Sequence, residues 1–177
     1  MIAAETGFAH SGRDAALLIA FTVLMGIAAA SDVRSRRIPN SIVVLIFALG
    51  ALFLMKGMGV SAGSAQLLEG AGTGLIVWIP MWLIGKLGAG DVKFFAAGAA
   101  WLGPHLALNA SVTSALLGGA LALVFMGRRK VATPDRMEIL APRVAPAEGE
   151  VSRETLPYGV AMAAGLTLTA WFPHLIR

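Results

Sequence analysis

The feature that constrains this chain most is a stretch of 34 residues, 94–127, without a charged side chain. Shorter apolar runs occupy 15–30, 42–55, 70–85 and 156–176. Hydrophobic residues make up 57% of the 177 residues and charged residues only 14%, where a soluble domain has about 25% charged residues. The sequence therefore predicts an all-α, polytopic membrane protein without a sizeable soluble domain.

The uncharged stretch is too long for one membrane span, which needs about 20 residues. Gly103-Pro104-His105 and Asn109 interrupt it, so we expect a short fourth span and then a fifth span over about 111–127. The whole chain, 1–177, is then a single membrane-embedded domain of about six transmembrane helices. Residues 128–155 are polar, contain proline and lack helical periodicity, which predicts a solvated cytoplasmic loop.

Small residues give two further expectations. Residues 58–66 are rich in glycine and serine, and are predicted to form the loop between the second and third spans. Gly70 with Gly74, and Ala115 with Gly119, are spaced four residues apart within apolar runs. Such pairs allow helices to approach closely, so both are predicted to face a neighbouring helix.

The basic residues predict the orientation of the spans. Eleven of the 14 lie between spans one and two, three and four, or five and six. These eleven are Arg34, Arg36, Arg37, Lys86, Lys93, Arg128, Arg129, Lys130, Arg136, Arg143 and Arg153. Only Arg13, Lys56 and Arg177 lie on the opposite side. The positive-inside rule therefore places the three basic loops in the cytoplasm and both termini outside.

Composition also bears on partners and cofactors. The chain has no cysteine, which excludes disulfides, thiolate zinc sites and a cysteine nucleophile. The net charge of +4 comes from basic residues beside apolar runs, so we expect contact with anionic membrane lipids and not with nucleic acid. His10, His105 and His174 lie at predicted outer ends or turns, so we predict no metal site and no cofactor.

The first apolar run has a second interpretation. Arg13, the run itself and Ala28-Ala29-Ala30 resemble a secretory signal peptide with its cleavage site. Three arginines follow within seven residues of that position, however, and positive charge there opposes export. A retained transmembrane helix is therefore favoured.

Two aspartates stand at the ends of apolar runs that the charge pattern places on one membrane face. Asp32 closes the first run, and Asp91 lies within Gly88-Ala89-Gly90-Asp91-Val92-Lys93. A carboxylate at the edge of a bilayer is costly and is seldom kept without a function. The plain alternatives are that Asp91 caps the start of a helix and that Asp32 is a polar flank beside Arg34. Together, the two carboxylates indicate a pair for acid–base chemistry.

Several neighbours are expected to shape this site. Gly88 and Gly90 allow close backbone approach and unusual backbone conformations around Asp91. Lys93 either stabilises the Asp91 carboxylate, contacts a substrate, or is simply an interfacial lysine. Pro39 is expected in the first turn of the second span, where proline is tolerated.

These motifs resemble a known family. Asp32 followed by Arg36-Arg37-Ile38-Pro39-Asn40, and then the Gly88–Lys93 segment, resembles the type IV prepilin peptidases, which are membrane aspartic proteases with a GxGD motif. Leu156-Pro157-Tyr158-Gly159 is similar to a weaker family signature. The resemblance implies that Asp32 and Asp91 are the catalytic pair, and that the protein lies in the bacterial inner membrane.

The resemblance also implies a substrate, namely a single-span prepilin-like subunit whose short basic leader is removed at the cytoplasmic face. The chain is most similar to the short peptidases of tight-adherence (Flp) pilus systems. It departs from the larger bifunctional members in lacking their cysteine-bearing insert and extended N-terminal region, which counts against N-methyltransferase activity but leaves residual activity open.

Helix positions suggest how two such carboxylates divide the chemistry. Hydrolysis of an amide needs one ionised and one protonated carboxyl group, and two close carboxylates share a proton. Asp91 is expected at a helix N-terminus, where the helix dipole favours negative charge, and Asp32 at a helix C-terminus, where it does not. This argument predicts that Asp91 is the base and Asp32 the acid.

Other functions fit part of the pattern. An ion- or proton-coupled transporter also uses membrane carboxylates, but it predicts an inverted repeat and acidic residues near the bilayer midplane, and neither is evident. A non-catalytic scaffold would use both aspartates only as caps. An archaeal preflagellin-type or presenilin-like peptidase is a third alternative, although the arginine-rich segment before Ile38-Pro39-Asn40 favours the pilus family.

Overall fold

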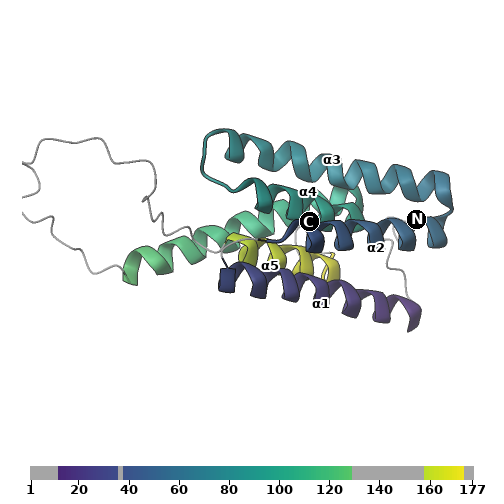
Figure 1. Ribbon diagram of the computed structural model, residues 1–177, viewed down its shortest axis with the longest axis horizontal. Helices are drawn as coiled ribbons and strands as arrows, with labels where there is room; N and C mark the ends of the chain where they lie inside the picture. Colours follow the sequence, from purple (N-terminus) through teal and green to yellow (C-terminus); the bar gives the residue numbers. More distant parts are fainter. Residues whose placement is uncertain (1–11, 36–37, 129–157, 174–177) are drawn as a thin grey trace, which may run out of the picture.

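The computed structural model describes residues 12–35, 38–128 and 158–173, and these residues form helices joined by short turns, without a strand (Figure 1). The helices are α1 (Gly12–Ser35), α2 (Asn40–Met58), α3 (Val60–Leu83), α4 (Ala89–Arg128) and α5 (Tyr158–Trp171). The predicted all-α class is confirmed. Apart from Arg128, the last residue of α4, the predicted polar loop 128–155 lies outside the described residues.

The described helices suit a membrane. Three segments are long and apolar enough to cross it, namely Ala15–Ser35, Asn40–Met58 and Ala89–Phe125. Large hydrophobic side chains are also exposed on the outside of the bundle; Ile76, for example, is 75% exposed and Leu123 is 71% exposed. An apolar surface of this extent fits lipid better than water. The number of crossings and the side on which each terminus lies stay predictions.

Helix α4 is broken where the sequence predicted an interruption. Gly103 has φ 76° and ψ 175°, which is not helical, and Pro104 follows it. Gly98 before the break and Ser114 after it lie at the same level of α5, against Leu166 and Gly165. The chain therefore reverses direction at Gly103 and returns along α5, as Figure 1 shows.

Glycine and proline explain the reversal. Glycine adopts a positive φ without a steric penalty, and proline has no N–H to continue the helix. The side-chain amide of Gln66 donates a long hydrogen bond of 3.5 Å to the Trp101 carbonyl beside the break. Asn109, which was also expected to interrupt the helix, lies inside the second half of α4.

The predicted loop over 58–66 is wrong. Helix α3 begins at Val60, and Gly59, with φ 83°, is the single residue between α2 and α3. A side chain at Gly63 would come within 2.6 Å of the Leu54 backbone. The small residues that suggested a loop therefore serve close packing of two antiparallel helices.

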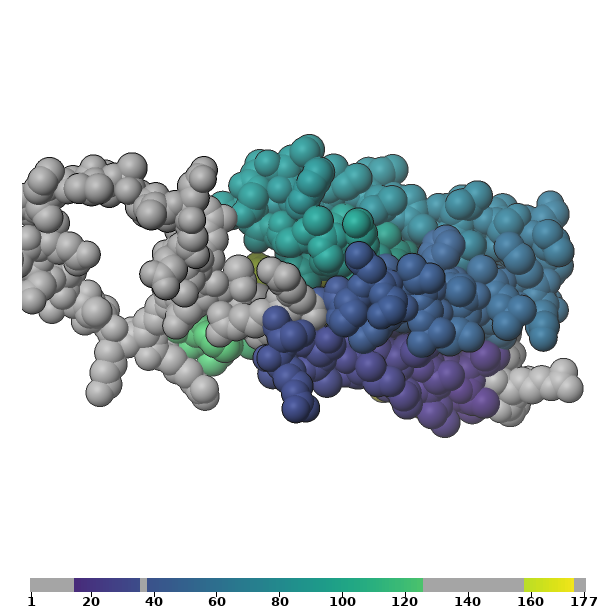
Figure 2. All heavy atoms as spheres, in the orientation of Figure 1, coloured from purple at the N-terminus to yellow at the C-terminus, as the bar shows by residue number. Residues whose placement is uncertain are grey.

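The first half of α4 forms the centre of the bundle. Phe94, Phe95 and Trp101 are buried there, and the Trp101 indole N–H donates a 2.9 Å hydrogen bond to the Ile46 carbonyl of α2. Gly70 and Gly74 of α3 face this half of α4, as predicted. On the face shown in Figure 2, α2 lies between α3 and α1.

The second predicted packing pair, Ala115 with Gly119, is wrong. A side chain at Gly119 would meet nothing within 4 Å, whereas one at Gly118 would come within 2.9 Å of the Tyr158 ring. The face of α4 that packs on α5 is thus offset by one residue and includes Ser114 and Gly118.

Candidate active site

Asp32 lies in the last turn of α1 and is buried, with only 7% of its surface exposed. One carboxylate oxygen, Oδ2, accepts a 3.0 Å hydrogen bond from the backbone N–H of Gly159. The neighbouring Arg34 is exposed. Asp32 is therefore not a solvated flank beside Arg34, because its carboxylate points into the protein toward the start of α5.

Gly159 touches Asp32 so closely that no side chain fits. A methyl group at Gly159 would lie 2.7 Å from Oδ2 and 2.9 Å from Cγ of Asp32. The sequence drew attention to Leu156-Pro157-Tyr158-Gly159 only as a weak family signature. It gave no reason to place Gly159 against Asp32, which is 127 residues away in the chain.

Asp91 lies in the first turn of α4 and is partly buried. The Gly88 carbonyl accepts hydrogen bonds from the backbone N–H groups of Asp91, at 3.1 Å, and Val92, at 3.3 Å. Helix α4 begins at Ala89, so the capping position belongs to Gly88 and Asp91 is the third helical residue. Asp91 is therefore not the N-cap residue itself, but its carboxylate does accept a hydrogen bond from the backbone of Gly88 at this helix start.

The two carboxylates come from distant parts of the sequence and are close enough to interact electrostatically. Figure 1 shows why, because the end of α1, the start of α5 and the α3–α4 connection lie at the same end of the bundle. Two carboxyl groups held together in this way share a proton more readily than both ionise. The structure thus brings together the pair that the sequence predicted.

Four residues, Gly88, Gly90, Lys93 and Pro39, were expected to shape the site, and only Gly88 lies directly beside a carboxylate. Gly88 lies beside Asp91, because a methyl group there would be 3.1 Å from Oδ2 of Asp91, whereas one at Gly90 would meet nothing within 4 Å. Lys93 is exposed and, two residues along the helix, does not face Asp91. Pro39 is the exposed residue just before α2, one position earlier than predicted, and its carbonyl accepts a 3.0 Å hydrogen bond from Ile42.

The expected unusual backbone at the motif glycines is not observed. Among the described residues, positive φ angles occur at Gly59, Gly85 and Gly103. Gly85, with φ 69°, lies in the turn that follows α3. Gly88 matters through the absence of a side chain next to Asp91, and Gly90 leaves open space beside the first turn of α4.

Comparison of the sequence with known proteins identifies the family of this chain. The sequence model of the type IV leader peptidase family matches residues 19–123, which include both aspartates. The chain belongs to this family. Among curated proteins, it is 31% identical over 122 residues to a prepilin leader peptidase/N-methyltransferase of Pectobacterium carotovorum subsp. carotovorum. The matched residues make up 66% of this chain and 42% of that protein.

A second relative is the prepilin leader peptidase/N-methyltransferase of Xanthomonas campestris pv. campestris. It is 31% identical over 137 residues, covering 72% of this chain and 46% of that protein. The chain thus spans less than half the length of these two relatives. Among solved structures, none matches the chain with significance. Membership of this family gives no support to the transporter alternative.

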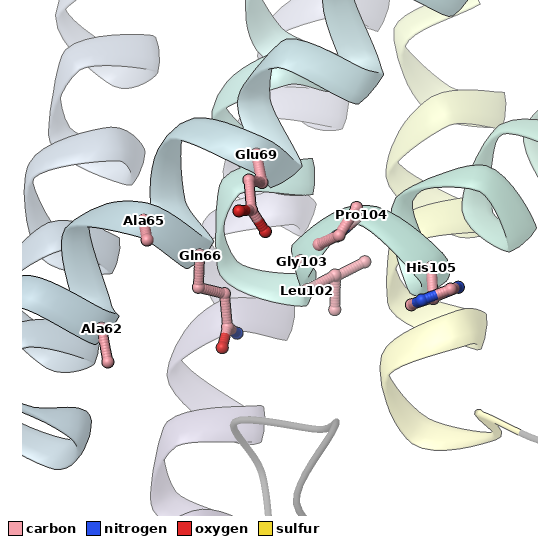
Figure 3. A pocket seen from close by; sticks show the side chains of 8 residues that line it. All are labelled: Ala62, Ala65, Gln66, Glu69, Leu102, Gly103, Pro104 and His105. Atoms are coloured by element: carbon pink, nitrogen blue, oxygen red, sulfur yellow. The ribbon is translucent and has the colours of Figure 1, made fainter.

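At the end of the bundle opposite the two aspartates, a cavity of about 290 Å³ lies at the break in α4 (Figure 3). Its lining includes Gln66, Glu69, Gly103 and His105. Within the described part of the chain, no group of three or more histidine, aspartate or glutamate side chains is arranged to hold a metal ion.

Proposed function

We propose that this protein is a membrane aspartic endopeptidase that removes the short basic leader from prepilin-like subunits. The observation that carries the proposal is that Asp32 and Asp91 are close enough to interact electrostatically at one end of the bundle, although α1 and α4 are far apart in the sequence. Membership of the type IV leader peptidase family supports it, as do the names of the two relatives.

The pair can hydrolyse a peptide bond without a cofactor. The ionised carboxylate takes a proton from a water molecule, whose oxygen then attacks the carbonyl carbon of the scissile bond. The protonated carboxyl group donates its proton to the carbonyl oxygen. As the C–N bond breaks, the other carboxyl group passes the proton it took from water to the leaving amine, and the first carboxylate takes back a proton from the intermediate, which restores the pair. The products are a free carboxylate on the leader and a free amine on the mature subunit.

We propose six membrane crossings, with α4 contributing two of them through its reversal at Gly103. The aspartates then lie near the cytoplasmic surface of the bacterial inner membrane. The basic residues at that end are Arg34 in the last turn of α1, Lys86 in the α3–α4 connection and Lys93 in the first half of α4, whereas Lys56 in the last turn of α2 lies at the other end. A single-span substrate with its basic leader in the cytoplasm would present its scissile bond at this depth. The proposal concerns the peptidase reaction, because this is the chemistry that Asp32 and Asp91 support.

The test is processing of a small pilin-like subunit co-expressed with the protein in a host without prepilin peptidases. We expect the wild type to remove the leader, seen as a gel shift and as a new N-terminus by mass spectrometry. Asp32→Asn and Asp91→Asn should leave the substrate unprocessed while the protein is still inserted in the membrane. Glu69→Gln, which changes an acidic residue at the other end of the bundle, is the matched control and should process normally. Normal processing by either aspartate variant would refute the proposal.

A further inference from the structure

We infer that Gly159 is a positioning residue for Asp32. Its backbone N–H donates a hydrogen bond to the carboxylate, and the absence of a side chain leaves the space that the carboxylate occupies. The inference rests on the proposed peptidase function. It concerns the start of α5, a region beyond the residues that the family match covers.

The first step of the argument is the hydrogen bond. Gly159 is the second residue of α5, and the first N–H groups of a helix have no partner within the helix. Here this N–H donates to Oδ2 of Asp32 over 3.0 Å. The contact fixes the position of one carboxylate oxygen relative to the helix start.

The second step is the absence of space. A methyl group at Gly159 would lie 2.7 Å from Oδ2, 2.9 Å from Cγ and 3.1 Å from Cβ of Asp32. Any other residue must therefore push the Asp32 side chain away from its position beside the Gly159 N–H. Because Gly159 does not have a positive φ, its glycine character is not required by the backbone.

The third step is that α5 is anchored near both ends, so Gly159 is held firmly. Tyr158 packs against α4 at Gly118, where a methyl group would come within 2.9 Å of the tyrosine ring. Near the other end of α5, the Trp171 indole N–H donates a 2.9 Å hydrogen bond to the Thr22 hydroxyl of α1. These contacts fix α5 relative to the helices that carry the two aspartates.

The hydrogen bond also bears on which carboxylate is the base. The position of Asp32 at the C-terminus of α1 predicted that Asp32 holds the proton, but the backbone N–H of Gly159, at the N-terminus of α5, donates to its carboxylate. The Asp91 carboxylate also has a backbone hydrogen bond, from Gly88. Because each carboxylate has a donor that favours its charged form, helix position alone does not assign the base.

The test compares wild type, Gly159→Ala and Gly26→Ala in the full-length chain, purified in detergent with a pilin-like substrate. We expect Gly159→Ala to lower kcat about 100-fold, as for a small displacement of a reacting group, with KM changed less than about twofold. Gly26→Ala adds the same methyl group to α1, the helix that carries Asp32, where it would meet nothing within 4 Å, and should keep the wild-type kcat. A wild-type kcat in folded Gly159→Ala overturns the inference, as does an equal loss in both variants.

A second measurement keeps the inference testable if Gly159→Ala does not fold. Replacing Asp32 by alanine removes Oδ2 and Cγ, the two atoms that the new methyl group would approach most closely, and leaves Cβ at 3.1 Å. We therefore expect Gly159→Ala to lower the melting temperature strongly in the wild type and little in the Asp32→Ala background. Equal losses in both backgrounds would show that Asp32 is not what excludes a side chain. Absence of any cleavage by the wild type would instead refute the proposed function, and this stability comparison does not depend on it.

Discussion

Glycine residues have different roles at the two ends of the bundle. At the aspartate end, Gly159 and Gly88 have ordinary backbone angles and give space to two carboxylates. At the opposite end, Gly103 needs its positive φ to reverse α4. The twelve residues from Asp91 to Gly103 span about 18 Å of helix, so the two ends are well separated. One end carries the proposed acid–base pair and the other reverses the chain, so substitutions at the two ends should have different consequences.

The largest effect is expected at the aspartate end. Asp32→Asn and Asp91→Asn should each lower kcat by at least about 100-fold, because each removes one partner of the acid–base pair. The double variant should be little worse than either single variant, since residues that act as a unit are not additive. Single-turnover cleavage measures this, and helical circular dichroism should stay unchanged. Multiplicative losses in the double variant would contradict a shared mechanism.

At the other end, Gly103→Ala should reduce stability and leave the chemistry intact. A residue other than glycine with φ 76° costs about 1–3 kcal/mol, and the new methyl group would also lie 3.3 Å from the Gln66 side chain. Thermal unfolding in detergent measures the loss. Gly72→Ala is the matched control, because its methyl group would meet nothing within 4 Å on α3. A selective loss of kcat in folded Gly103→Ala would break the distinction between the two ends.

Gly90→Ala sharpens the comparison within the aspartate end. The methyl group would meet nothing within 4 Å, so the free energy of unfolding should not fall. If the substrate backbone passes through this open space, kcat/KM should fall about tenfold, which corresponds to about 1.4 kcal/mol. Steady-state cleavage measures it alongside thermal unfolding. Unchanged kcat/KM would show that the substrate does not use the space beside Gly90.

The smallest effect is expected in the core between the two ends. Trp101→Phe removes the indole hydrogen bond to the Ile46 carbonyl while keeping an aromatic ring beside Phe21 and Phe53. The free energy of unfolding should fall by about 1 kcal/mol. Chemical or thermal unfolding checks this value, with the exposed Trp82→Phe as the control. A change in kcat for Trp101→Phe would show that the core and the carboxylate pair are coupled.

Features set by local chemistry were predictable from the sequence. Apolar length indicated helices, and Gly103-Pro104 indicated the break in α4, because glycine and proline act on the backbone wherever they stand. The charge pattern predicted that Asp32 and Asp91 lie on one membrane face, and the structure places the two carboxylates close enough to interact electrostatically. The membrane face itself stays a prediction.

Features set by packing between distant segments were not predictable. Residues 58–66 looked like a loop, because the close contact of Gly63 with the α2 backbone is not visible in local composition. The same reason explains why the sequence predicted that Gly119, and not Gly118, packs against a neighbouring helix. Gly159 was missed because its role depends on a contact with Asp32 across 127 residues of sequence.

The most direct measurement of the central claim is the proximity of the two aspartate positions in the membrane. The chain has no cysteine, so Asp32→Cys with Asp91→Cys creates a unique pair for a short thiol-reactive cross-linker. Thr22→Cys with Trp171→Cys, at side chains that are hydrogen-bonded, is the positive control, and Asp32→Cys with Glu69→Cys is the negative control. The structure predicts an intramolecular cross-link between positions 32 and 91 and none between 32 and 69. Efficient reaction of the positive control without a link between positions 32 and 91 would contradict the account.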